Sequence, residues 1–372
     1  MNIGIIGCGN ISTAYLTLAP QFRDVNIVAC SDLNDSAAKA QAEFFGIRSL
    51  SIDALLADQS IDLILNLTIP SAHLEVSTLA LMAGKHVYSE KPYVLSLSEG
   101  RQLAALAAEK NRRIGSAPDT FMGGAHQSAR ALIDSDRIGR VVGGTCHFMT
   151  HGVEGWHPNP DFFYHKGGGP MLDMGAYYIS NLVQLIGPVK RLMAMSSIPF
   201  STRTISSEPR AGEIINVETA TSINAILEFH NGAQVTLGLS WDVWHHEHNC
   251  MELYGTKATM HVPDPNFFGG EPRINDGEEE VVVVPDHPFS APNYEDNSGA
   301  MVANFRGAGL ADMVDAIATN RTHRCNDALA LHVIDVMTSA VHSGETGQPV
   351  VIDSTCERPE ALDGNAAVSL LV

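Results

Sequence analysis

The sequence predicts an α/β Rossmann domain with a doubly wound parallel sheet, followed by an α+β domain with a large, mostly antiparallel open sheet. Three observations favour this division. Strand patterns alternate with helix patterns in the first third of the chain. A glycine-rich turn follows the first strand. The alternation then stops, and long strand patterns with period-two hydrophobicity follow. Because 372 residues exceed one ordinary core, we expect domains at 1–120 and 121–372.

The composition limits the classes of partner. The chain is 45% hydrophobic and 17% charged, and none of its apolar runs reaches the length of about 20 residues that a membrane span needs. The N-terminal residues enter a strand pattern directly and show no signal-peptide pattern. The six cysteines are scattered without a Cys-x-x-Cys pair, which favours a reducing cytoplasm. A net charge of −19 disfavours nucleic acid and anionic membranes as partners.

The first predicted strand leads into a glycine motif that opens a helix. The motif consists of Gly7, Gly9, Asn10, Ile11 and Ser12. The first glycine permits a tight turn, the second lets the backbone approach a pyrophosphate, and the last position must be small so that helix and strand pack closely. The helix N-terminus offers free N–H groups and a positive dipole end to the diphosphate. The pattern therefore predicts a dinucleotide cradle.

An acid at the end of the second strand favours NAD over NADP. Asp32 follows the motif by about 20 residues, where a carboxylate can accept hydrogen bonds from the adenosine ribose. The same carboxylate would repel a 2′-phosphate, and the next residues, Leu33 and Asn34, supply no positive charge. We therefore expect NAD as the cofactor, with NADP less favoured.

Two more strand ends are expected at the same edge of the sheet. The strand at 61–68 ends at Thr68, followed by Pro70 and His73. The short strand at 86–88 ends before Glu90 and Lys91. Because ligands bind at the carboxyl ends of parallel strands, we expect all of these segments to meet at the cofactor.

These motifs together resemble the glucose–fructose oxidoreductase/inositol dehydrogenase family, often called Gfo/Idh/MocA. The resemblance covers nearly the whole chain and is carried by four segments: Gly7-Cys8-Gly9-Asn10-Ile11, Thr68-Ile69-Pro70 with His73, Ala83-Gly84-Lys85-His86-Val87 leading into Glu90-Lys91-Pro92, and Gly167-Gly168-Gly169 leading into Asp173-Met174-Gly175-Ala176-Tyr177.

The resemblance implies roles for three residues. Lys91 corresponds to the active-site lysine, and the Lys91–Pro92 peptide bond is commonly cis in this family. Asp173 and, four residues on, Tyr177 correspond to a pair thought to act as acid and base, although many relatives carry histidine at the second position. A partly desolvated lysine near an oxidised nicotinamide should have a lowered pKa and could relay a proton. We expect Lys91 and Tyr177 to share the proton relay and Asp173 to orient a substrate hydroxyl; which of Lys91 and Tyr177 accepts the proton stays open.

The second domain offers candidate substrate-binding residues. An aromatic and histidine-rich loop precedes the predicted helix at 171–186 and contains Trp156, His157 and Tyr164. Loops of this kind often line pockets for small polar ligands. His246 lies in a second histidine-rich segment, for which we favour pocket lining. His246 and His248 share a strand face, but further ligands are not evident, so no metal site is predicted.

The remaining C-terminal patterns complete the predicted fold. Asn231-Gly232 between two alternating runs predicts a β-hairpin. A loop-like stretch at 264–299, which includes a strand at 281–284, precedes helices at 310–319 and 328–342. The tail after Val351 is expected to be coil. The open face of the large sheet serves as the oligomer surface in the resembling family, so we expect a homodimer or homotetramer.

The leading hypothesis is a cytoplasmic, NAD-dependent dehydrogenase acting on a secondary alcohol of a sugar, cyclitol or sugar derivative. A non-catalytic sensor that binds dinucleotide or sugar on the same fold is an alternative, because fold does not fix function. An oxidoreductase that keeps NAD(P) bound and recycles it between two substrates is another.

Overall fold

A computed structural model describes residues 1–296 and 298–372, which form two compact units. The first unit comprises Met1–Gly123, His287–Leu331 and Pro359–Val372, and the second comprises Gly124–Asp286 and His332–Arg358. The N-terminal segment of the first unit thus ends close to the predicted boundary at 120. The other two segments of this unit were expected in the second domain, so their placement differs from the prediction.

The first unit is built on a parallel sheet with the strand order β3-β2-β1-β4-β5-β6. This is the doubly wound order of a Rossmann fold, so the prediction of the first fold class is confirmed. The strands are β1 (Asn2–Ile6), β2 (Asn26–Ser31), β3 (Arg48–Ser49), β4 (Leu63–Asn66), β5 (His86–Ser89) and β6 (Ile114–Ser116).

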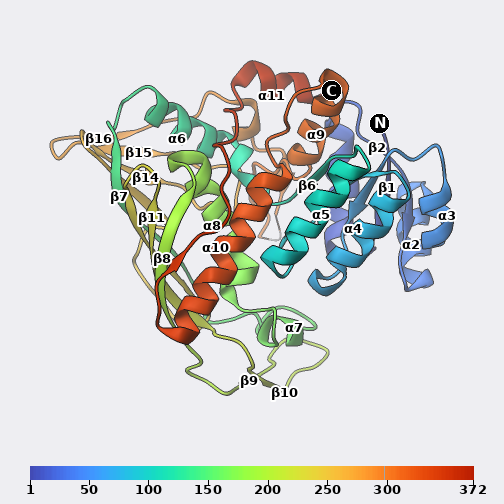
Figure 1. The fold of residues 1–372 in the computed structure, drawn as a ribbon, viewed down its shortest axis with the longest axis horizontal. Coiled ribbons are helices and arrows are strands. Elements are labelled where there is room, and N and C mark those ends of the chain that lie inside the picture. Colours follow the sequence, from blue (N-terminus) through green and yellow to red (C-terminus); the bar gives the residue numbers. More distant parts are fainter. Residues whose placement is uncertain (297) are drawn as a thin grey trace. The chain divides into compact units, whose positions relative to one another are not determined.

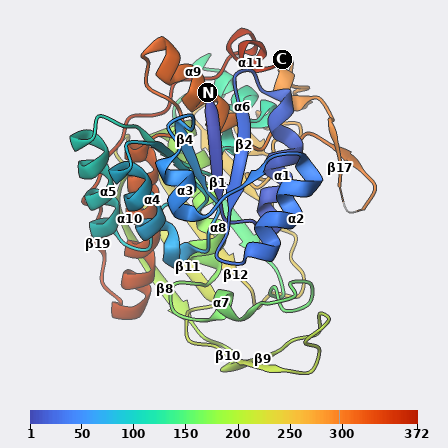
Figure 2. The same cartoon turned by 90° about the vertical axis from the view of Figure 1, so that its right-hand side faces the viewer.

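Helices connect these strands and cover the sheet. They are α1 (Asn10–Leu18), α2 (Asp35–Phe45), α3 (Ile52–Ala57), α4 (His73–Met82) and α5 (Leu97–Glu109). Figure 2 shows α1 and α2 on one side of strands β1 and β2, and α4 and α5 on the other side. Strand β1 is almost entirely apolar, and Ile3 and Ile5 are fully buried. A strand covered on both faces requires such a continuous apolar run.

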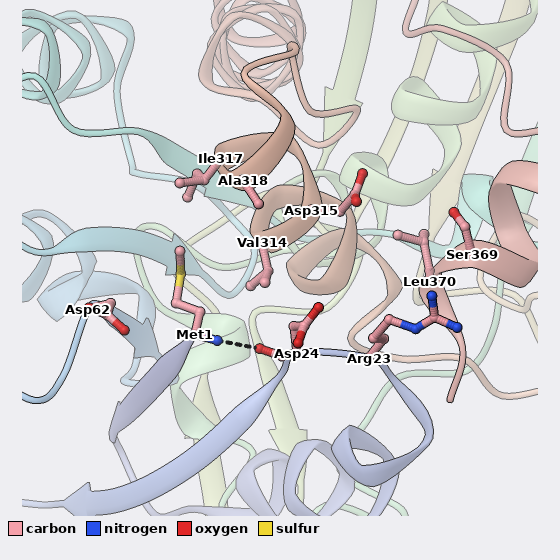
Figure 3. A pocket seen from close by; sticks show the side chains of 10 residues that line it. All are labelled: Met1, Arg23, Asp24, Asp62, Val314, Asp315, Ile317, Ala318, Ser369 and Leu370. Carbon is pink, nitrogen blue, oxygen red and sulfur yellow. Dashed lines mark hydrogen bonds between the residues drawn. The ribbon is translucent and has the colours of Figure 1, made fainter.

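The C-terminal part of the chain returns to this unit. It contributes α9 (Ala308–Thr319), α11 (Gly364–Leu370) and the paired strands β17 (Tyr294–Glu295) and β18 (Met301–Val302). The predicted coil after Val351 is therefore wrong for α11, whose N-cap Asp363 accepts a hydrogen bond from the amide of Ala366. A pocket lies between α9, α11 and the residues that precede the strands (Figure 3).

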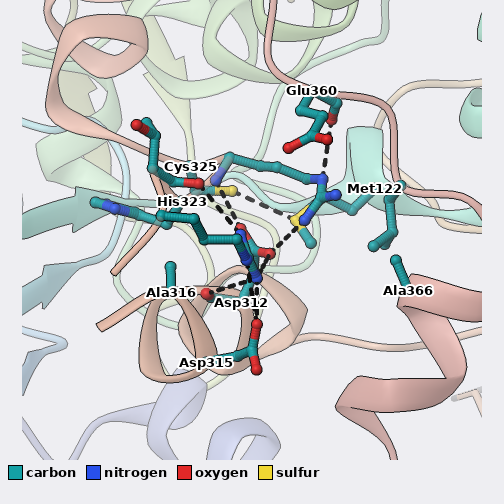
Figure 4. A network of polar contacts seen from close by, with 12 residues as sticks. Met122, Asp312, Asp315, Ala316, His323, Cys325, Glu360 and Ala366 are labelled. Atoms are coloured by element: carbon teal, nitrogen blue, oxygen red, sulfur yellow. Dashed lines mark hydrogen bonds and ion pairs between the residues drawn. The ribbon is translucent and has the colours of Figure 1, made fainter. Parts of the chain in front are cut away.

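A buried ion-pair network joins residues 287–331 to residues 359–372 (Figure 4). Asp312 on α9 is fully buried and pairs with Arg324 Nη1 at 2.5 Å and Arg321 Nη2 at 2.7 Å. Arg324 also donates to the carbonyl oxygens of Glu360 at 2.9 Å and Ala361 at 3.0 Å. Because breaking such a buried pair would leave an uncompensated charge, the network holds both C-terminal segments together.

The second unit is built on a mixed, mostly antiparallel sheet, which confirms the predicted second fold class. Its strand order is β16-β15-β14-β13-β7-β12-β11-β8-β19, in which β7 and β12 pair in parallel. The strands are β7 (Val141–Met149), β8 (Val189–Ser197), β11 (Ser222–Phe229), β12 (Gln234–Ser240), β13 (Met251–Gly255), β14 (Thr259–Val262), β15 (Arg273–Asn275), β16 (Glu280–Val282) and β19 (Val350–Val351). The hairpin predicted at Asn231-Gly232 joins β11 and β12, with Gly232 at positive φ.

Helices cover one face of this sheet, and short elements form a separate arm. Helix α8 (Pro170–Ile186) packs on β7, β11 and β12 (Figure 1), beside α6 (Gly124–Asp134). The arm contains α7 (Asp161–Tyr164), β9 (Thr202–Thr204) and β10 (Ile214–Asn216). Helix α10 (Asp327–Thr346) begins in the first unit and continues in the second.

Helix α8 is buried along nearly all of its length. Its polar residues Asn181 and Gln184 are buried as well, and Gln184 Nε2 donates to Asn181 Oδ1 at 2.9 Å. Asn181 Nδ2 lies 3.2 Å from Nδ1 of the buried His126 on α6. The polar positions that follow Tyr177 along the helix thus serve packing between helices.

The stretch predicted as mostly loop at 264–299 contains β15 and part of the β17–β18 pair as well as β16, which overlaps the strand predicted at 281–284. Its residue 297 lies outside the described residues. None of the helices described is both long and apolar enough to cross a membrane.

Candidate active site

The first unit brings the predicted cofactor residues to one edge of its sheet. Gly7 follows β1, Asp32 follows β2, Thr68 follows β4, and Glu90 and Lys91 follow β5. Since β2, β1, β4 and β5 are consecutive neighbours in a parallel sheet, their carboxyl ends form a continuous row. Backbone bonds tie this row together, including Gly7 N to Ser31 O at 2.9 Å and Glu90 N to Asn66 O at 2.9 Å.

The two glycines of the motif have different physical requirements. Gly7 has φ +105°, and a Cβ atom there would lie 2.6 Å from the carbonyl carbon and oxygen of Leu67. A Cβ atom on Gly9 would meet nothing within 4 Å. Gly9 is also the N-cap of α1, and no side chain caps this helix end. An open backbone surface at an uncapped helix N-terminus suits a pyrophosphate, so these residues fit a dinucleotide.

Asp32 presents a carboxylate held in place by backbone amides. Its Oδ2 accepts from the amide of Cys8 at 2.7 Å, and its Oδ1 accepts from the amide of Asn34 at 2.7 Å. The acid therefore joins the end of β2 to the glycine motif. Lone pairs that remain on the two oxygens can accept ribose hydroxyls. Leu33 beside it is 94% exposed, so its apolar side chain is available to a ligand.

His73 connects the Thr68 segment to the segment after Lys91. The side chain is fully buried, with Nδ1 2.7 Å from the carbonyl oxygen of Pro92 and Nε2 2.9 Å from that of Thr68. Burial lowers the pKa of His73, and the two carbonyl contacts oppose this effect. A neutral ring donates from only one nitrogen, so both contacts are hydrogen bonds only when the ring is protonated. A cofactor-binding role for His73 and the half-buried Pro70 stays a prediction.

Glu90 is buried beside Lys91 and engages both of its carboxylate oxygens. Oε1 accepts from the Tyr15 hydroxyl at 3.0 Å and from Arg306 Nη1 at 3.1 Å. Oε2 accepts from the amide of Lys91 at 2.9 Å. The Lys91–Pro92 peptide bond is cis, as the resemblance implies. The carboxylate thus fixes the backbone that carries the lysine.

In the second unit, α8 carries the proposed acid and base. Tyr177 is buried and Asp173, one turn earlier, is half-buried. The glycines before the helix permit a tight approach, because a Cβ atom on Gly168 would lie 2.4 Å from the carbonyl oxygen of Phe163. Within this unit the glycines therefore accommodate the preceding loop.

His157 and Trp156 lie in the loop that leads to α8. Burial lowers the pKa of His157, and the negative charge of Asp173 opposes this shift, which places His157 within the electrostatic reach of the acid. The ring of Trp156 packs edge to face on His157, with centroids 5.5 Å apart. Trp156 is 67% exposed. This pair can offer a ligand an imidazole and an open indole face.

Tyr164 and His246 have different surroundings from this pair. Tyr164 is fully buried in a cluster with Val153 and Trp241, and its hydroxyl donates to Glu154. These contacts make Tyr164 part of the core of the unit, and its substrate-binding role stays an untested prediction. His246 is half-buried in the segment after β12, with its ring 6.0 Å from that of His248. Its role also stays a prediction.

Several residues that shape the two sites were missed from the sequence. Asn66 is buried at the end of β4, and its Oδ1 accepts from the Thr68 amide at 3.2 Å and hydroxyl at 2.7 Å. Tyr15 and Arg306 hold Glu90. In the second unit, the buried Arg203 pairs with Glu154 at 3.1 Å and with Asp242. The sequence could have indicated Asn66, because it is a polar residue at the end of an apolar strand. It could not have indicated Arg306, which lies 215 residues from Lys91.

Two other features are not part of the cofactor cradle. The pocket of Figure 3 adjoins Met1, Asp24 and Asp62, which precede β1, β2 and β4 and so mark the opposite edge of the sheet. Within residues 1–296 and 298–372, His, Cys, Asp and Glu side chains form no group of three that could hold a metal ion.

Two family models match the chain. Residues 1–117 match an oxidoreductase family with an NAD-binding Rossmann fold, and residues 126–261 match the GFO/IDH/MocA C-terminal domain. The two matched segments correspond to the Rossmann sheet and to the part of the second unit from α6 through β14.

Curated relatives match at moderate identity. An uncharacterised oxidoreductase of Schizosaccharomyces pombe is 33% identical over 156 residues, which is 40% of this chain and 41% of the relative. The chain thus matches about two fifths of the length of this protein and of a second S. pombe oxidoreductase, for which the share is 42%. The dTDP-3,4-didehydro-2,6-dideoxy-α-D-glucose 3-reductase of Saccharopolyspora spinosa is 28% identical over 269 residues, covering 70% of this chain and 74% of that protein.

Solved structures share the fold. A levoglucosan dehydrogenase in complex with NADH and L-sorbose superposes with a TM-score of 0.80 at 18% identity, covering 95% of this chain and 99% of that one. At this identity the likeness concerns the fold alone.

Proposed function

This chain belongs to the Gfo/Idh/MocA family of oxidoreductases, and from this premise we propose that it is an NAD-dependent dehydrogenase acting on a secondary alcohol of a sugar or sugar derivative. The observation that carries the proposal is the geometry after β5, where buried Glu90 fixes the backbone of Lys91 at the carboxyl edge of a Rossmann sheet. A protein that only binds a dinucleotide has no need of a lysine anchored in this way.

The residues at the sheet edge would hold the cofactor. Gly7 permits the tight turn after β1, Gly9 leaves room for the pyrophosphate at the N-terminus of α1, and Asp32 would accept the ribose hydroxyls. When bound, the nicotinamide supplies hydride transfer, which is the difficult part of the chemistry. The amides that hold Asp32 keep its carboxylate in place before binding, so little ordering is needed when the ribose arrives.

Lys91 is the proposed proton-handling group of the first unit. Its ammonium can donate a hydrogen bond to the substrate hydroxyl oxygen and stabilise negative charge that develops there. After losing a proton it can accept the hydroxyl proton itself. The bond from the Lys91 amide to Glu90 restricts the backbone from which this side chain extends.

Tyr177 and Asp173 are the proposed acid–base and orienting groups of the second unit. A phenol with a reference pKa near 10 needs a positive neighbour to act as a base near neutrality, so we assign the relay to Lys91 and Tyr177 together. Asp173, as a carboxylate, accepts a substrate hydroxyl and orients it. The spacing of four residues places both side chains on one face of α8.

A sugar-like substrate is supported by the chemistry of the second unit and by the named relatives. Asp173 and His157 offer hydrogen-bonding groups for hydroxyls, and the exposed Trp156 offers an aromatic face. The S. spinosa relative and the levoglucosan dehydrogenase both bear names of sugar-acting oxidoreductases.

Two further expectations from the sequence stay proposals. We propose a homodimer or homotetramer formed through the open face of the second unit's sheet, where Met193, Met195 and Ile226 are exposed. A cytoplasmic location also stays a prediction from the sequence.

A substrate screen with a lysine variant tests the proposal. The protein is assayed against sugars, cyclitols and their acids with NAD and NADP in parallel, following absorbance of the reduced cofactor. Lys91→Ala should reduce kcat by about 10²- to 10⁴-fold, the range of acid–base catalysis, while NADH binding followed by fluorescence changes little. Equal loss of turnover and NADH binding would indicate that Lys91 has a structural role.

The same screen distinguishes the two alternative functions. A wild-type protein that binds NADH but turns over none of the panel would favour the sensor alternative. Cofactor absorbance in the purified protein would favour tightly bound, recycled NAD(P).

The preference for NAD has a separate test. Asp32→Ser removes the charge that would repel a 2′-phosphate but keeps a small polar side chain. The ratio of kcat/KM with NAD to that with NADP should fall by about tenfold, equivalent to ~1.4 kcal/mol. An unchanged ratio would refute the ribose assignment.

A further inference from the structure

We propose that Arg306 is a positioning residue for Lys91 and acts through the carboxylate of Glu90. This role presupposes the catalytic role of Lys91 proposed above. Arg306 lies just before α9, 215 residues from Lys91 along the chain, yet both belong to the first unit. Its guanidinium contacts Glu90, whose side chain accepts a hydrogen bond from the Lys91 amide.

The contacts form a chain from guanidinium to lysine. Arg306 Nη1 lies 3.1 Å from Glu90 Oε1, and the Tyr15 hydroxyl donates to the same oxygen at 3.0 Å. With Oε1 held by two donors, the second oxygen of the planar carboxylate has a fixed direction. That oxygen, Oε2, accepts from the Lys91 amide at 2.9 Å. The side chain of Glu90 is only 9% exposed, so water is a poor substitute for these donors.

The backbone that carries Arg306 is itself anchored. Asp119 is buried, and its Oδ2 accepts from the amides of Gly307 at 2.9 Å and Gly309 at 3.1 Å. Gly307 has φ +100°, and a Cβ atom on Gly309 would lie 2.2 Å from the Tyr88 hydroxyl. These contacts restrict the backbone of the turn before α9 and so fix the position from which the Arg306 side chain extends.

The guanidinium also balances charge around Lys91. Glu90 and Asp119 are both buried carboxyl groups within the electrostatic reach of Arg306. His73 and Tyr15 are the other titratable groups that face Glu90 from α4 and α1. If the guanidinium is removed, the negative charge of Glu90 is less compensated, and a neighbouring lysine keeps its proton to higher pH.

Matched arginine variants test this role. Arg306→Gln removes the charge, Arg306→Lys keeps it, and Arg48→Gln is the control, because Arg48 forms an exposed pair with Asp58 in the same unit. We expect Arg306→Gln to lower kcat by about 10- to 100-fold, as a misplaced catalytic group does, with the KM for NAD changed by less than about threefold. The pH at which kcat rises should move up by roughly one unit. Arg306→Lys should recover most of kcat and the original pH profile, and the control should match the wild type.

A second measurement does not depend on activity. Hydrogen–deuterium exchange at the Lys91 amide, resolved by fragmentation mass spectrometry, should become faster in Arg306→Gln and remain near the wild-type rate in Arg306→Lys and Arg48→Gln. Unchanged exchange together with an unchanged pH profile would overturn the positioning role. If Lys91→Ala keeps full turnover, the catalytic assignment of Lys91 fails, and the exchange rates still decide whether Arg306 fixes its backbone. Circular dichroism of each variant identifies any loss of fold, in which case Arg306→Lys alone decides the outcome.

Discussion

The two units of this protein organise their candidate functional residues in different ways. In the first unit, Gly7, Asp32 and Lys91 all lie where parallel strands end, and main-chain hydrogen bonds fix that edge. In the second unit, Asp173 and Tyr177 share one helix, whereas Trp156 and His246 lie on separate loops. The first site is therefore set by sheet topology, and the second by the packing of individual side chains.

This difference between the units indicates where substitutions should be tolerated. A site defined by backbone geometry depends on residues that permit a conformation, such as Gly7, or that bind amides, such as Asp32 and Glu90. A site defined by side chains on loops can change one ligand contact without disturbing the others. Loops vary more readily than the elements they connect, so the second unit is the natural place for substrate preference to diverge.

The largest expected effect comes from the two glycines of the cradle. Gly7→Ala forces a residue into φ +105° and a Cβ into the Leu67 carbonyl, so it should destabilise the first unit by about 3 kcal/mol. Gly9→Ala meets open space and should change the free energy of unfolding by no more than about 1 kcal/mol, the effect of an N-cap change. It should still weaken NADH binding, because the methyl group occupies the phosphate side of the turn. Thermal unfolding measures the loss of stability, and NADH fluorescence measures the loss of cofactor binding. Equal destabilisation by both variants would contradict the open space beside Gly9.

The position of the first unit's candidate residues at one edge of the sheet could be predicted because the signals are local. Glycine spacing, an acid at a strand end and a Glu-Lys-Pro segment each report on a few adjacent residues, and parallel topology then brings them together. The partners of Glu90 could not be found in this way. Tyr15 reads as an apolar position of a helix, and nothing near Arg306 in the sequence indicates a partner at residue 90, since side-chain pairs across long separations depend on the folded path.

The second site was less predictable for the same reason. Trp156 and Tyr164 belong to one aromatic loop and looked equivalent in sequence, yet one ring is exposed and the other is buried against Trp241. The grouping of residues 287–331 and 359–372 with the first unit also differs from the expected division, because contacts such as that of Arg113 Nη1 with the carbonyl oxygen of Ala316, at 3.0 Å, are nonlocal.

Adjacent tyrosines on α8 offer a smaller and sharper test of the second unit. Tyr177→Phe should lower kcat by about 100-fold, within the range of acid–base catalysis. Tyr178→Phe is the matched control, because the hydroxyl of the buried Tyr178 donates to Asp264 Oδ1 at 2.8 Å. Burial and Asp264 raise the pKa of Tyr178, so this phenol is a poor proton acceptor near neutrality. Its loss should cost about 1 kcal/mol of stability with little change in kcat. The reverse pattern would move the catalytic role to Tyr178.

The smallest expected effect separates ligand contact from core packing within the aromatic loop. Trp156→Ala removes an indole that is 67% exposed, so it should raise the KM for the sugar by about tenfold, equivalent to ~1.4 kcal/mol, without lowering the free energy of unfolding. Tyr164→Phe removes a buried hydroxyl that donates to Glu154 and accepts from the Val153 amide at 3.2 Å. It should destabilise the unit by about 1–2 kcal/mol and leave KM unchanged. Steady-state kinetics and denaturant unfolding of both variants measure the two quantities. A raised KM in Tyr164→Phe with unchanged stability would instead place Tyr164 at the substrate and remove the contrast between the two rings.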